Sequence, residues 1–442
     1  MPNLDSLSDH QPSLLLDAER SEKVCGLLLL GEKRSLTLDS ASPDAYARIS
    51  DFVGSAQGRC FGWIGYDQLQ AHPLLDLPAQ GPTAVQLPVV HWVEPQGVLS
   101  FCGLGPEAEL EWLVKCDAAL VQKAERALTA ALSIDPTRPA QRTGASLLDA
   151  PAYLAAFNRV KQHILRGDIY ELNLCREITG QLDGDWSAAE GFKRLVEATS
   201  APFSAWMKWN SVDILCASPE RFLRREGDRL ISQPIKGTAP RDADPNRDRA
   251  IAEALRNDAK ERAENVMITD LVRNDMSQVA RKGSVHVEEL CGVYSFKNVH
   301  QMISTVTCEV RPDAGFSDIL HASFPMGSMT GAPKIRAMEI TAEVEPVSRG
   351  LYSGTLGWAD PDGLGGVGDF DLNVVIRTAL VDVAAKKWSV HVGGAITALA
   401  TAQAEWTETR LKARAVLDAL SAAETSQSAT PTEKATPPEH AR

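Results

Sequence analysis

The segment Pro234-Ile235-Lys236-Gly237 places one lysine between a rigid approach that begins with proline and a permissive glycine. Proline fixes its own φ angle, and glycine, which has no Cβ, lets a ligand or another backbone come close. If such a lysine is also withdrawn from water, it loses its preference for the ammonium form, and the free amine becomes a nucleophile or a general base. Taken alone, the segment favours a surface turn with an exposed lysine, so its neighbours must decide.

Two pairs of glutamates have the spacing i and i+3 within helical sequence, Glu261 with Glu264 and Glu405 with Glu408. Each pair projects from one face of its helix. Two such faces turned toward each other would form an oxygen-rich cage for a hard divalent cation. Mg²⁺ fits this description because it takes few protein carboxylates and keeps several waters. For either pair alone, a solvated helix face is the better interpretation.

The bulk composition excludes several classes of protein. The formal net charge of −13 disfavours broad binding to nucleic acid or to an anionic membrane. No apolar stretch is long enough to span a bilayer, and the first residues do not form a basic region followed by an apolar run, so we expect a cytoplasmic protein. The eight cysteines lack CxxC spacing, which predicts buried thiols in a reducing compartment and no zinc site.

Composition predicts a division of the chain into four parts. Residues 1–135 form a sheet-rich N-terminal segment, and the polar, proline-containing residues 136–150 form a linker. Residues 151–420 form the main domain. Residues 421–442 consist of Ser, Thr, Ala, Glu and Pro without an apolar face, which predicts a disordered tail.

Local patterns predict individual elements. Apolar runs predict buried strands at 24–30 and 59–67, and residues 89–93 with 97–101 predict a hairpin. A pattern rich in Ala, Leu, Glu and Lys predicts a helix over 107–132. Apolar spacing predicts an amphipathic helix over 151–166, followed by a strand over 169–178. Thr330 and Pro333 are typical of the N-cap and the first turn of a further helix.

Several segments of the main domain, in this order, resemble the chorismate-utilising enzymes. The likeness runs from about residue 152 to residue 420 and is carried by residues 217–223, 232–241, 263–275, 324–339, 350–354, 375–378, 393–396 and 405–409. The resemblance implies an α+β fold in which two antiparallel sheets pack face to face, with helices outside and the active site between the sheets. In this family the N-terminal segment contributes a sheet that packs against the catalytic part.

The resemblance also implies a magnesium site that binds the ring carboxylate of chorismate. The matching carboxylates are Glu264 and Glu408 as direct ligands, with Glu261 and Glu405 acting through water. The resemblance thus favours a metal site formed by the two glutamate pairs over the interpretation of each pair as a solvated helix face.

Other matching positions would bind the rest of the substrate. Arg377 offers a planar fork for the carboxylate of the enolpyruvyl side chain, assisted by Tyr352. Gly393 and Gly394 would supply main-chain N–H groups, and Lys412 would supply a cation beside the glutamates. His300 would lie near the ring, and Thr330 would supply a hydroxyl that positions the substrate. His300 in an apolar strand is also typical of a core histidine.

Lys236 distinguishes among the activities of the family, because aminodeoxychorismate synthases have lysine at this point and anthranilate synthases have alanine. The resemblance implies that the amine of Lys236 attacks C2 of chorismate while Glu220, as general acid, protonates the leaving C4 hydroxyl. Ammonia then adds at C4 and displaces the lysine, giving 4-amino-4-deoxychorismate. The sequence shows no Gly-x-Cys-x-Gly nucleophile elbow, so a separate glutamine amidotransferase is expected to supply the ammonia.

Three alternatives remain open. Anthranilate synthase component I is opposed by Lys236 alone, and a regulatory protein that binds chorismate without turnover is opposed by the full set of catalytic and acidic residues. An isochorismate or salicylate synthase would have lysine at the position of Glu171.

Glutamine is usual there in the family, and Glu171 either alters how water or ammonia is held or is an exposed strand residue. Met326 replaces a usual glycine and affects local shape.

Overall fold

The computed structural model describes residues 13–16, 25–102, 108–129, 141–146, 150–183 and 186–420. The predicted tail at 421–442 lies outside the described residues, as do residues 136–140 and 147–149 of the predicted linker. The middle of that linker is a strand, β8 (Gln141–Ser146), which pairs with the main sheet.

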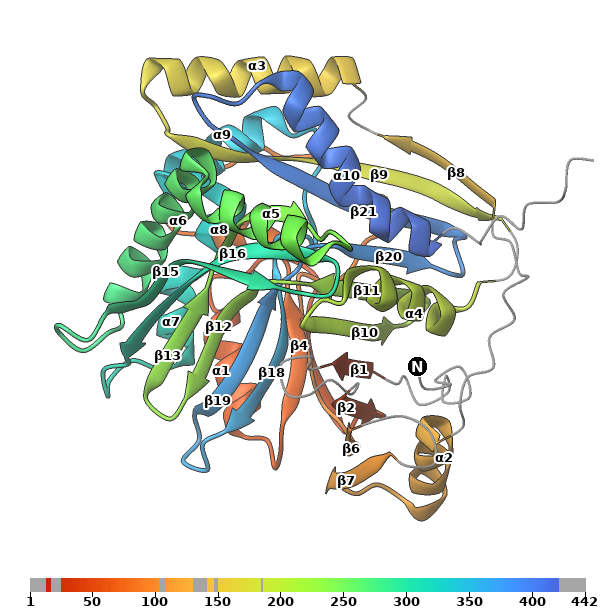
Figure 1. Ribbon diagram of the computed structural model, residues 1–442. Helices are drawn as coiled ribbons and strands as arrows, with labels where there is room; N and C mark the ends of the chain where they lie inside the picture. The colour runs from red at the N-terminus through yellow and green to blue at the C-terminus, as the bar shows by residue number, and fades with distance from the viewer. Residues whose placement is uncertain are drawn as a thin grey trace, which may run out of the picture.

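Two large antiparallel sheets make up the framework (Figure 1). The 11-stranded sheet has the order β17 (Gly331–Ala332), β9 (Glu171–Asp183), β21 (Lys387–Ile396), β20 (Thr378–Asp382), β11 (Val212–Ser218), β10 (Phe203–Trp209), β1 (Ser13–Leu16), β2 (Cys25–Leu30), β6 (Gly97–Cys102) and β7 (Glu109–Val114), with β8 beside β9. The 10-stranded sheet has the order β14 (Ile235–Pro240), β16 (Val299–Glu309), β13 (Arg229–Gln233), β12 (Arg221–Glu226), β19 (Val367–Val374), β18 (Thr355–Pro361), β4 (Cys60–Ile64), β5 (Val90–Glu94) and β3 (Arg34–Leu38), with β15 (His286–Ser295) beside β16.

Helices cover the outer faces of both sheets. Apolar residues of α2 (Ala118–Thr129), α4 (Ala188–Thr199) and α10 (Ala402–Leu420) pack on the 11-stranded sheet. Those of α1 (Ala45–Gly54), α6 (Ala259–Ser277) and α7 (Phe316–Ser323) pack on the 10-stranded sheet. The remaining helical segments are α3 (Ala150–Arg166), α5 (Pro245–Asn257), α8 (Gly327–Thr330), α9 (Lys334–Val344) and the 3₁₀ helix η2 (Tyr66–Ala71).

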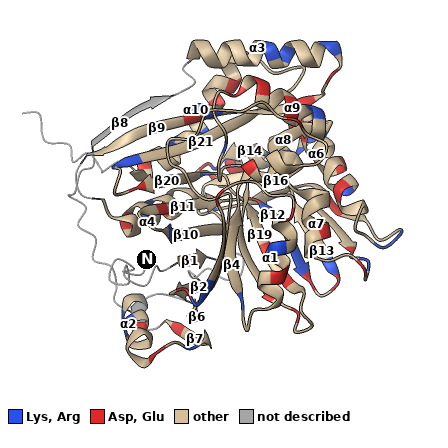
Figure 2. Ribbon diagram, turned by 180° about the vertical axis from the view of Figure 1, so that it is seen from behind, with Lys and Arg blue, Asp and Glu red and all other residues tan. Residues whose placement is uncertain are grey.

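The two sheets face each other across a shared apolar layer. Trp63 and Leu356 from the 10-stranded sheet lie in one cluster with Met207 and Ile214 from the 11-stranded sheet. The predicted α+β architecture of two facing antiparallel sheets with helices outside is therefore confirmed. In Figure 2, seen from behind, both signs of charge lie on α1 and on α9, so the acidic excess is not gathered on these helices.

Strand β4 shows why a continuous apolar run forms a central strand here. Phe61 and Trp63 contribute to clusters between the sheets, while Cys60 and Ile64 contribute to the cluster under the helices. Because both faces are covered, every residue of β4 is buried. The run of consecutive apolar residues is the pattern expected for a strand buried on both faces.

Gly62, at the centre of β4, gives a test of this close packing. A Cβ at this position would lie 2.2 Å from the carbonyl oxygen of His91 and 2.6 Å from Cγ of Trp92. We expect Gly62→Ala to lower the free energy of unfolding in urea by about 3 kcal/mol, because the backbone of β5 would have to move. The control is Gly58→Ala, whose Cβ would lie at an ordinary 3.5 Å from Val114 and whose effect should stay within about 0.5 kcal/mol. Equal effects of the two substitutions would contradict the close approach.

The predicted hairpin at 89–93 and 97–101 is wrong. Both strands exist, as β5 and β6, but β5 pairs with β3 and β4 whereas β6 pairs with β2 and β7. The short connection at Pro95 and Gln96 therefore carries the chain from one sheet to the other. The N-terminal segment predicted at 1–135 contributes strands to both sheets and continues them without a break.

The predicted helix at 107–132 is wrong in its first part. Residues Glu109–Val114 form β7, in which exposed and half-buried side chains alternate, and the helix α2 begins only at Ala118. The alternation of Glu109, Leu110, Glu111 and Trp112 has the period of a strand, and pairing with β6 stabilises it. By contrast, α3 and β9 confirm the helix predicted at 151–166 and the strand predicted at 169–178, β9 extending to Asp183.

Two further observations concern the cysteines and the membrane. Cys25 and Cys102 lie directly opposite each other on β2 and β6 and form a disulfide, so the prediction of thiols is wrong for this pair. The other six cysteines are free thiols, five of them buried. Within the part of the chain that the structure describes, no helix is long and apolar enough to cross a membrane.

Candidate active site

Lys236 lies at the edge of the 10-stranded sheet, in β14, beside helix α6. Its side chain is only 12% exposed, so the interpretation as a surface turn is wrong. The next residue, Gly237, has a φ of +90°, and a Cβ there would lie 3.2 Å from Cβ of Glu261. Glycine thus allows β14 to pass directly against the face of α6 that carries the first glutamate pair.

The amine of Lys236 is paired with a carboxylate. Nζ donates a hydrogen bond of 2.9 Å to Oε1 of Glu171, the first residue of β9. Glu171 is 1% exposed, so its interpretation as an exposed strand residue is also wrong. This contact joins the edge strand of one sheet to a strand of the other.

The carboxylates around Lys236 decide its protonation. Burial by itself lowers the pKa of Lys236, but Glu171, Glu264 and Glu220 act in the opposite direction, and the pKa is raised above its ordinary value. The sequence led us to expect that a withdrawn lysine would lose its preference for the ammonium form. That expectation is wrong for this site, because the lysine is buried together with acidic partners.

Glu220 occupies the loop between β11 and β12 and is buried. Burial raises the pKa of Glu220 to about 7, and the effect is moderated by a hydrogen bond from Ser328 and by the charge of Lys236. The Ser328 hydroxyl donates to Oε1 of Glu220 over 2.7 Å. A carboxyl group with this pKa can hold a proton at neutral pH and release it, as a general acid requires.

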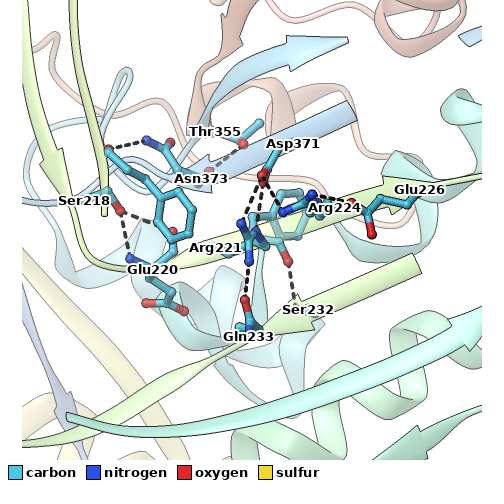
Figure 3. A network of polar contacts seen from close by, with 12 residues as sticks. Ser218, Glu220, Arg221, Arg224, Glu226, Ser232, Gln233, Thr355, Asp371 and Asn373 are labelled. Atoms are coloured by element: carbon cyan, nitrogen blue, oxygen red, sulfur yellow. Dashed lines mark hydrogen bonds and ion pairs between the residues drawn. The ribbon is translucent and has the colours of Figure 1, made fainter. Parts of the chain in front are cut away.

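The strand that follows Glu220 is fixed by a polar network (Figure 3). The guanidinium of Arg221 donates to both carboxylate oxygens of Asp371, at 3.0 and 3.1 Å, and also to Gln233. These contacts connect β12 to its two neighbours, β19 and β13. In Figure 3 the carboxyl group of Glu220 points away from the Arg221–Asp371 pair, so the network holds the backbone and leaves this group for the site.

The two predicted glutamate pairs lie on α6 and α10 and influence one another. Burial first, and then the charge of Glu408, raises the pKa of Glu405 to about 7, and Glu264 adds to this shift. Burial also raises the pKa values of Glu261 and Glu264. Gly394 of β21 lies against the second pair, since a Cβ there would be 2.9 Å from Oε2 of Glu405. The structure therefore brings four carboxylates from two helices to one region.

Two of these carboxylate oxygens suit a hard cation. Oε1 of Glu264 and Oε2 of Glu405 are buried and accept no hydrogen bond from the described residues. The ammonium of Lys260 lies 3.7 Å from Oε1 of Glu264. No three His, Cys, Asp or Glu side chains converge closely enough, among the residues described, to form a ready-made metal site. Carboxylate oxygens are the type of ligand that Mg²⁺ prefers, but here they lie farther apart than the ligands of a complete metal site.

Arg377, Tyr352 and Lys412 lie close to this acidic region. Arg377 stands between β19 and β20 and donates to the carbonyl oxygen of Lys412 over 3.1 Å. Lys412 in turn donates to Glu408 over 2.6 Å and to the carbonyl oxygen of Gly393 over 3.1 Å. Tyr352 is buried and stacks on His391 with 5.5 Å between ring centroids. Lys412 therefore balances one glutamate and ties α10 to β21.

His300 and Thr330 are held by the protein itself. The two ring nitrogens of the buried His300 contact Asp248 at 3.0 Å and Ser295 at 2.8 Å. Thr330 is the last residue of α8 and donates to carbonyl oxygens of the same turn. The prediction that Thr330 caps the next helix is wrong: α9 begins after Pro333, because Gly331–Ala332 pairs with β9. Met326 packs into the apolar core.

Three residues that contribute to the site were not predicted from the sequence. Lys260 stands four residues before Glu264, a spacing that places both on one helix face and would have revealed it. Ser328 reaches Glu220 only through tertiary structure, so no local pattern predicts it. Arg349 is buried, pairs with Glu345, and donates to the carbonyl oxygen of Asn173 over 2.8 Å, which steadies β9 near Glu171.

A separate cavity of about 330 Å³ lies between the sheets near the N-terminal strands. Its lining includes Leu15, Arg59, Phe101, Trp358 and Asn373. None of the predicted catalytic or metal-binding residues is among the described residues that line it. The concentration of buried ionisable groups, and not the size of this cavity, therefore identifies the candidate active site.

Comparisons with known proteins agree with this arrangement. A family model described as chorismate binding enzyme matches residues 11–418. The chain is 36% identical over 379 residues to an aminodeoxychorismate synthase component 1 of Klebsiella aerogenes, covering 82% of this chain and 77% of that protein. It is also 36% identical over 307 residues to an anthranilate synthase component 1 of Haloferax volcanii, covering 68% of this chain and 57% of that protein.

A solved structure shares the fold. Anthranilate synthase component I from Streptococcus pneumoniae TIGR4 superposes with a TM-score of 0.72 at 22% identity, covering 89% of this chain and 92% of that one. The family match spans most of the sequence, and the structural likeness includes the facing sheets that hold the site. The chain therefore belongs to the family of chorismate-binding enzymes.

Proposed function

We propose that this protein is the chorismate-aminating component of an aminodeoxychorismate synthase, which makes 4-amino-4-deoxychorismate for para-aminobenzoate and folate synthesis. The observation that carries the proposal is the presence in one site of a buried lysine, Lys236, and a buried glutamate, Glu220, whose pKa is raised by burial to about 7 and is influenced by the charge of that lysine. A nucleophile and a proton donor in one withdrawn site suit the displacement of a hydroxyl group, which is a poor leaving group.

In this proposal Lys236 attacks C2 of chorismate through Nζ. Glu220, held by Ser328, gives its proton to the C4 hydroxyl, which leaves as water. Ammonia then forms a bond to C4, and the bond from Nζ to C2 breaks. Dividing one difficult displacement into two steps lowers each barrier.

The neighbouring residues would bind the two carboxylates of the substrate. Arg377, with Tyr352 beside it, would hold the carboxylate of the enolpyruvyl side chain. Glu264 and Glu408 would hold Mg²⁺ directly, with Glu261 and Glu405 through water, and the bound ion would supply a positive charge for the ring carboxylate. The buried oxygens of Glu264 and Glu405 that accept no hydrogen bond from the described residues support a cation between the two pairs, whereas Glu408 already pairs with Lys412.

Ammonia would come from a separate glutamine amidotransferase. The Klebsiella aerogenes relative carries the name component 1, which supports the existence of a partner component. Free ammonium at high concentration would replace the partner in the test tube. The catalytic component can therefore be tested alone.

A product assay tests the proposal. The purified protein is given chorismate, ammonium and Mg²⁺, and the product is separated by chromatography and identified by mass. We expect 4-amino-4-deoxychorismate, no product after treatment with EDTA, and recovery when Mg²⁺ is restored. Fluorescent anthranilate as the product would move the assignment to anthranilate synthase. Binding of chorismate without any product, even with a glutaminase partner, would indicate a regulatory protein.

A further inference from the structure

A carboxylate faces the amine of Lys236 at hydrogen-bonding distance. Oε1 of Glu171 lies 2.9 Å from Nζ, and the glutamate is 1% exposed. Its second oxygen, Oε2, is also buried and accepts no hydrogen bond from any residue that the structure describes. Glu171 therefore has unused capacity to accept a proton beside the lysine.

The backbone holds this carboxylate in place. Glu171 pairs with Ala332 of β17, and the next residue, Leu172, pairs with Ile396 of β21 on the other side. Gly331 has a φ of +145°, and a Cβ there would lie 2.2 Å from the carbonyl oxygen of Glu171. Because strands flank β9 on both sides at this point, the side chain cannot retreat through a shift of its own backbone.

Lys236 needs a proton acceptor if it is to act as a nucleophile. An ammonium group has no lone pair, and the acidic surroundings of Lys236 favour that form. Carboxylates face it from β9, from the loop before β12, from α6 and from α10, and they belong to Glu171, Glu220, Glu261, Glu264 and Glu408. Within the described residues, Glu171 is the one that accepts a hydrogen bond from Nζ.

We propose that Glu171 takes the proton of the Lys236 ammonium along this hydrogen bond and thereby frees the amine for attack. This inference rests on the proposed function. One proton moves from nitrogen to oxygen, leaving an amine and a carboxylic acid. Two buried charges disappear together, and burial by itself favours the neutral pair, which offsets part of the preference that the carboxylates give to the ammonium form.

The remaining protons balance over the cycle. Nζ forms its bond to C2, the C4–O bond breaks, and the proton of Glu220 leaves with the hydroxyl group as water. When ammonia bonds to C4, the lysine departs as a neutral amine and regains its proton from Glu171. The new C4 ammonium group gives one proton to Glu220, which restores the acid. No oxidant or reductant is needed.

The proposal is specific to a chain with glutamate at this position. Glutamine has nearly the size and shape of glutamate and can accept a hydrogen bond from Lys236, but it cannot take its proton. Glu171→Gln is therefore the informative substitution. Glu177→Gln is the matched control, because Glu177 is a buried glutamate of the same strand that accepts hydrogen bonds from Ser389 and from the backbone of Ala84.

The pH profile distinguishes internal proton transfer from release to solvent. With internal transfer, the active form has the same number of protons as the resting form, so kcat/KM falls as Glu220 ionises above about pH 7. If Lys236 gave its proton to solvent, the active form would have one proton fewer. In that case kcat/KM would rise with pH up to about 7 and level off above it, because the gain of free amine and the loss of protonated Glu220 then cancel.

The experiment compares wild type, Glu171→Gln, Glu171→Asp and Glu177→Gln. Turnover of chorismate with ammonium is measured between about pH 6 and 9, and the reaction of Lys236 with an amine-selective reagent is followed by peptide mass. For Glu171→Gln we expect kcat to fall about 10²-fold, the decline above pH 7 to disappear, and labelling to become faster at neutral pH, because the ammonium has lost its partner. Glu171→Asp should restore the decline, and Glu177→Gln should behave as wild type.

Two results would overturn the proposal. One is a Glu171→Gln variant with the rate and pH profile of wild type, and the other is a parallel increase in labelling and turnover, which would show that Glu171 only stabilises the ammonium. If wild type makes no 4-amino-4-deoxychorismate, the proposed function fails. The labelling of Lys236 then still shows whether Glu171 is its ion-pair partner, and unchanged labelling in Glu171→Gln would exclude that as well.

Discussion

Replacing Lys236 by alanine is expected to reduce the formation of 4-amino-4-deoxychorismate by on the order of 10³-fold or more. The substitution removes the atom that bonds to C2, so the direct displacement of the C4 hydroxyl would have to occur in one step. The groups proposed to bind the two carboxylates of chorismate remain, so KM should change little. The measurement is steady-state turnover with saturating ammonium and Mg²⁺, with the product identified by mass.

Controls must separate the loss of a nucleophile from the loss of an ion pair. Lys236→Ala leaves Glu171 buried without its cation, which can destabilise the protein. The double variant Lys236→Ala with Glu171→Gln removes both charges and should be equally inactive while regaining stability. Lys387→Ala, which changes an exposed lysine at the far end of β21, should retain the wild-type rate. Substantial product from Lys236→Ala would show that the lysine is not the nucleophile.

The sequence predicted the general fold because several segments matched one family, and it predicted single elements where the pattern was local. β4 and α3 follow directly from their apolar spacing. The false hairpin shows the limit of this approach. β5 and β6 are neighbours in sequence, yet each finds its partners in a different sheet, and only the packing of distant strands decides this.

The candidate site shows the same limit in its electrostatics. Sequence reasoning named Lys236, Glu220 and the four glutamates, but it predicted the wrong preferred form of the lysine. Glu171 stands 65 residues before Lys236, and Ser328 stands 108 residues after Glu220. The charge state of a buried group depends on such distant partners. A single sequence therefore identifies the chemical groups more readily than it identifies their protonation.

Glu220→Gln is expected to lower kcat by about 10²–10⁴-fold, because an amide cannot donate the proton that the departing hydroxyl group needs. The direction in which kcat/KM changes with pH follows from the pKa of Glu220. Burial raises the pKa of Glu220 to about 7, so the group is protonated below that pH and loses its proton above it. With the lysine proton retained inside the site, wild-type kcat/KM should therefore fall as the pH rises past about 7, and the Gln variant should show no such fall.

Ser328→Ala provides the finer test of this assignment. The Ser328 hydroxyl donates to Oε1 of Glu220 and so favours the carboxylate form, which lowers the pKa of Glu220 from the value that burial alone would give. Removing the hydroxyl should raise this pKa and move the decline in kcat/KM to higher pH, with only a small loss of activity at pH 6. A decline that stays in place in Ser328→Ala, or that survives in Glu220→Gln, would mean that another group titrates and that Glu220 is not the general acid.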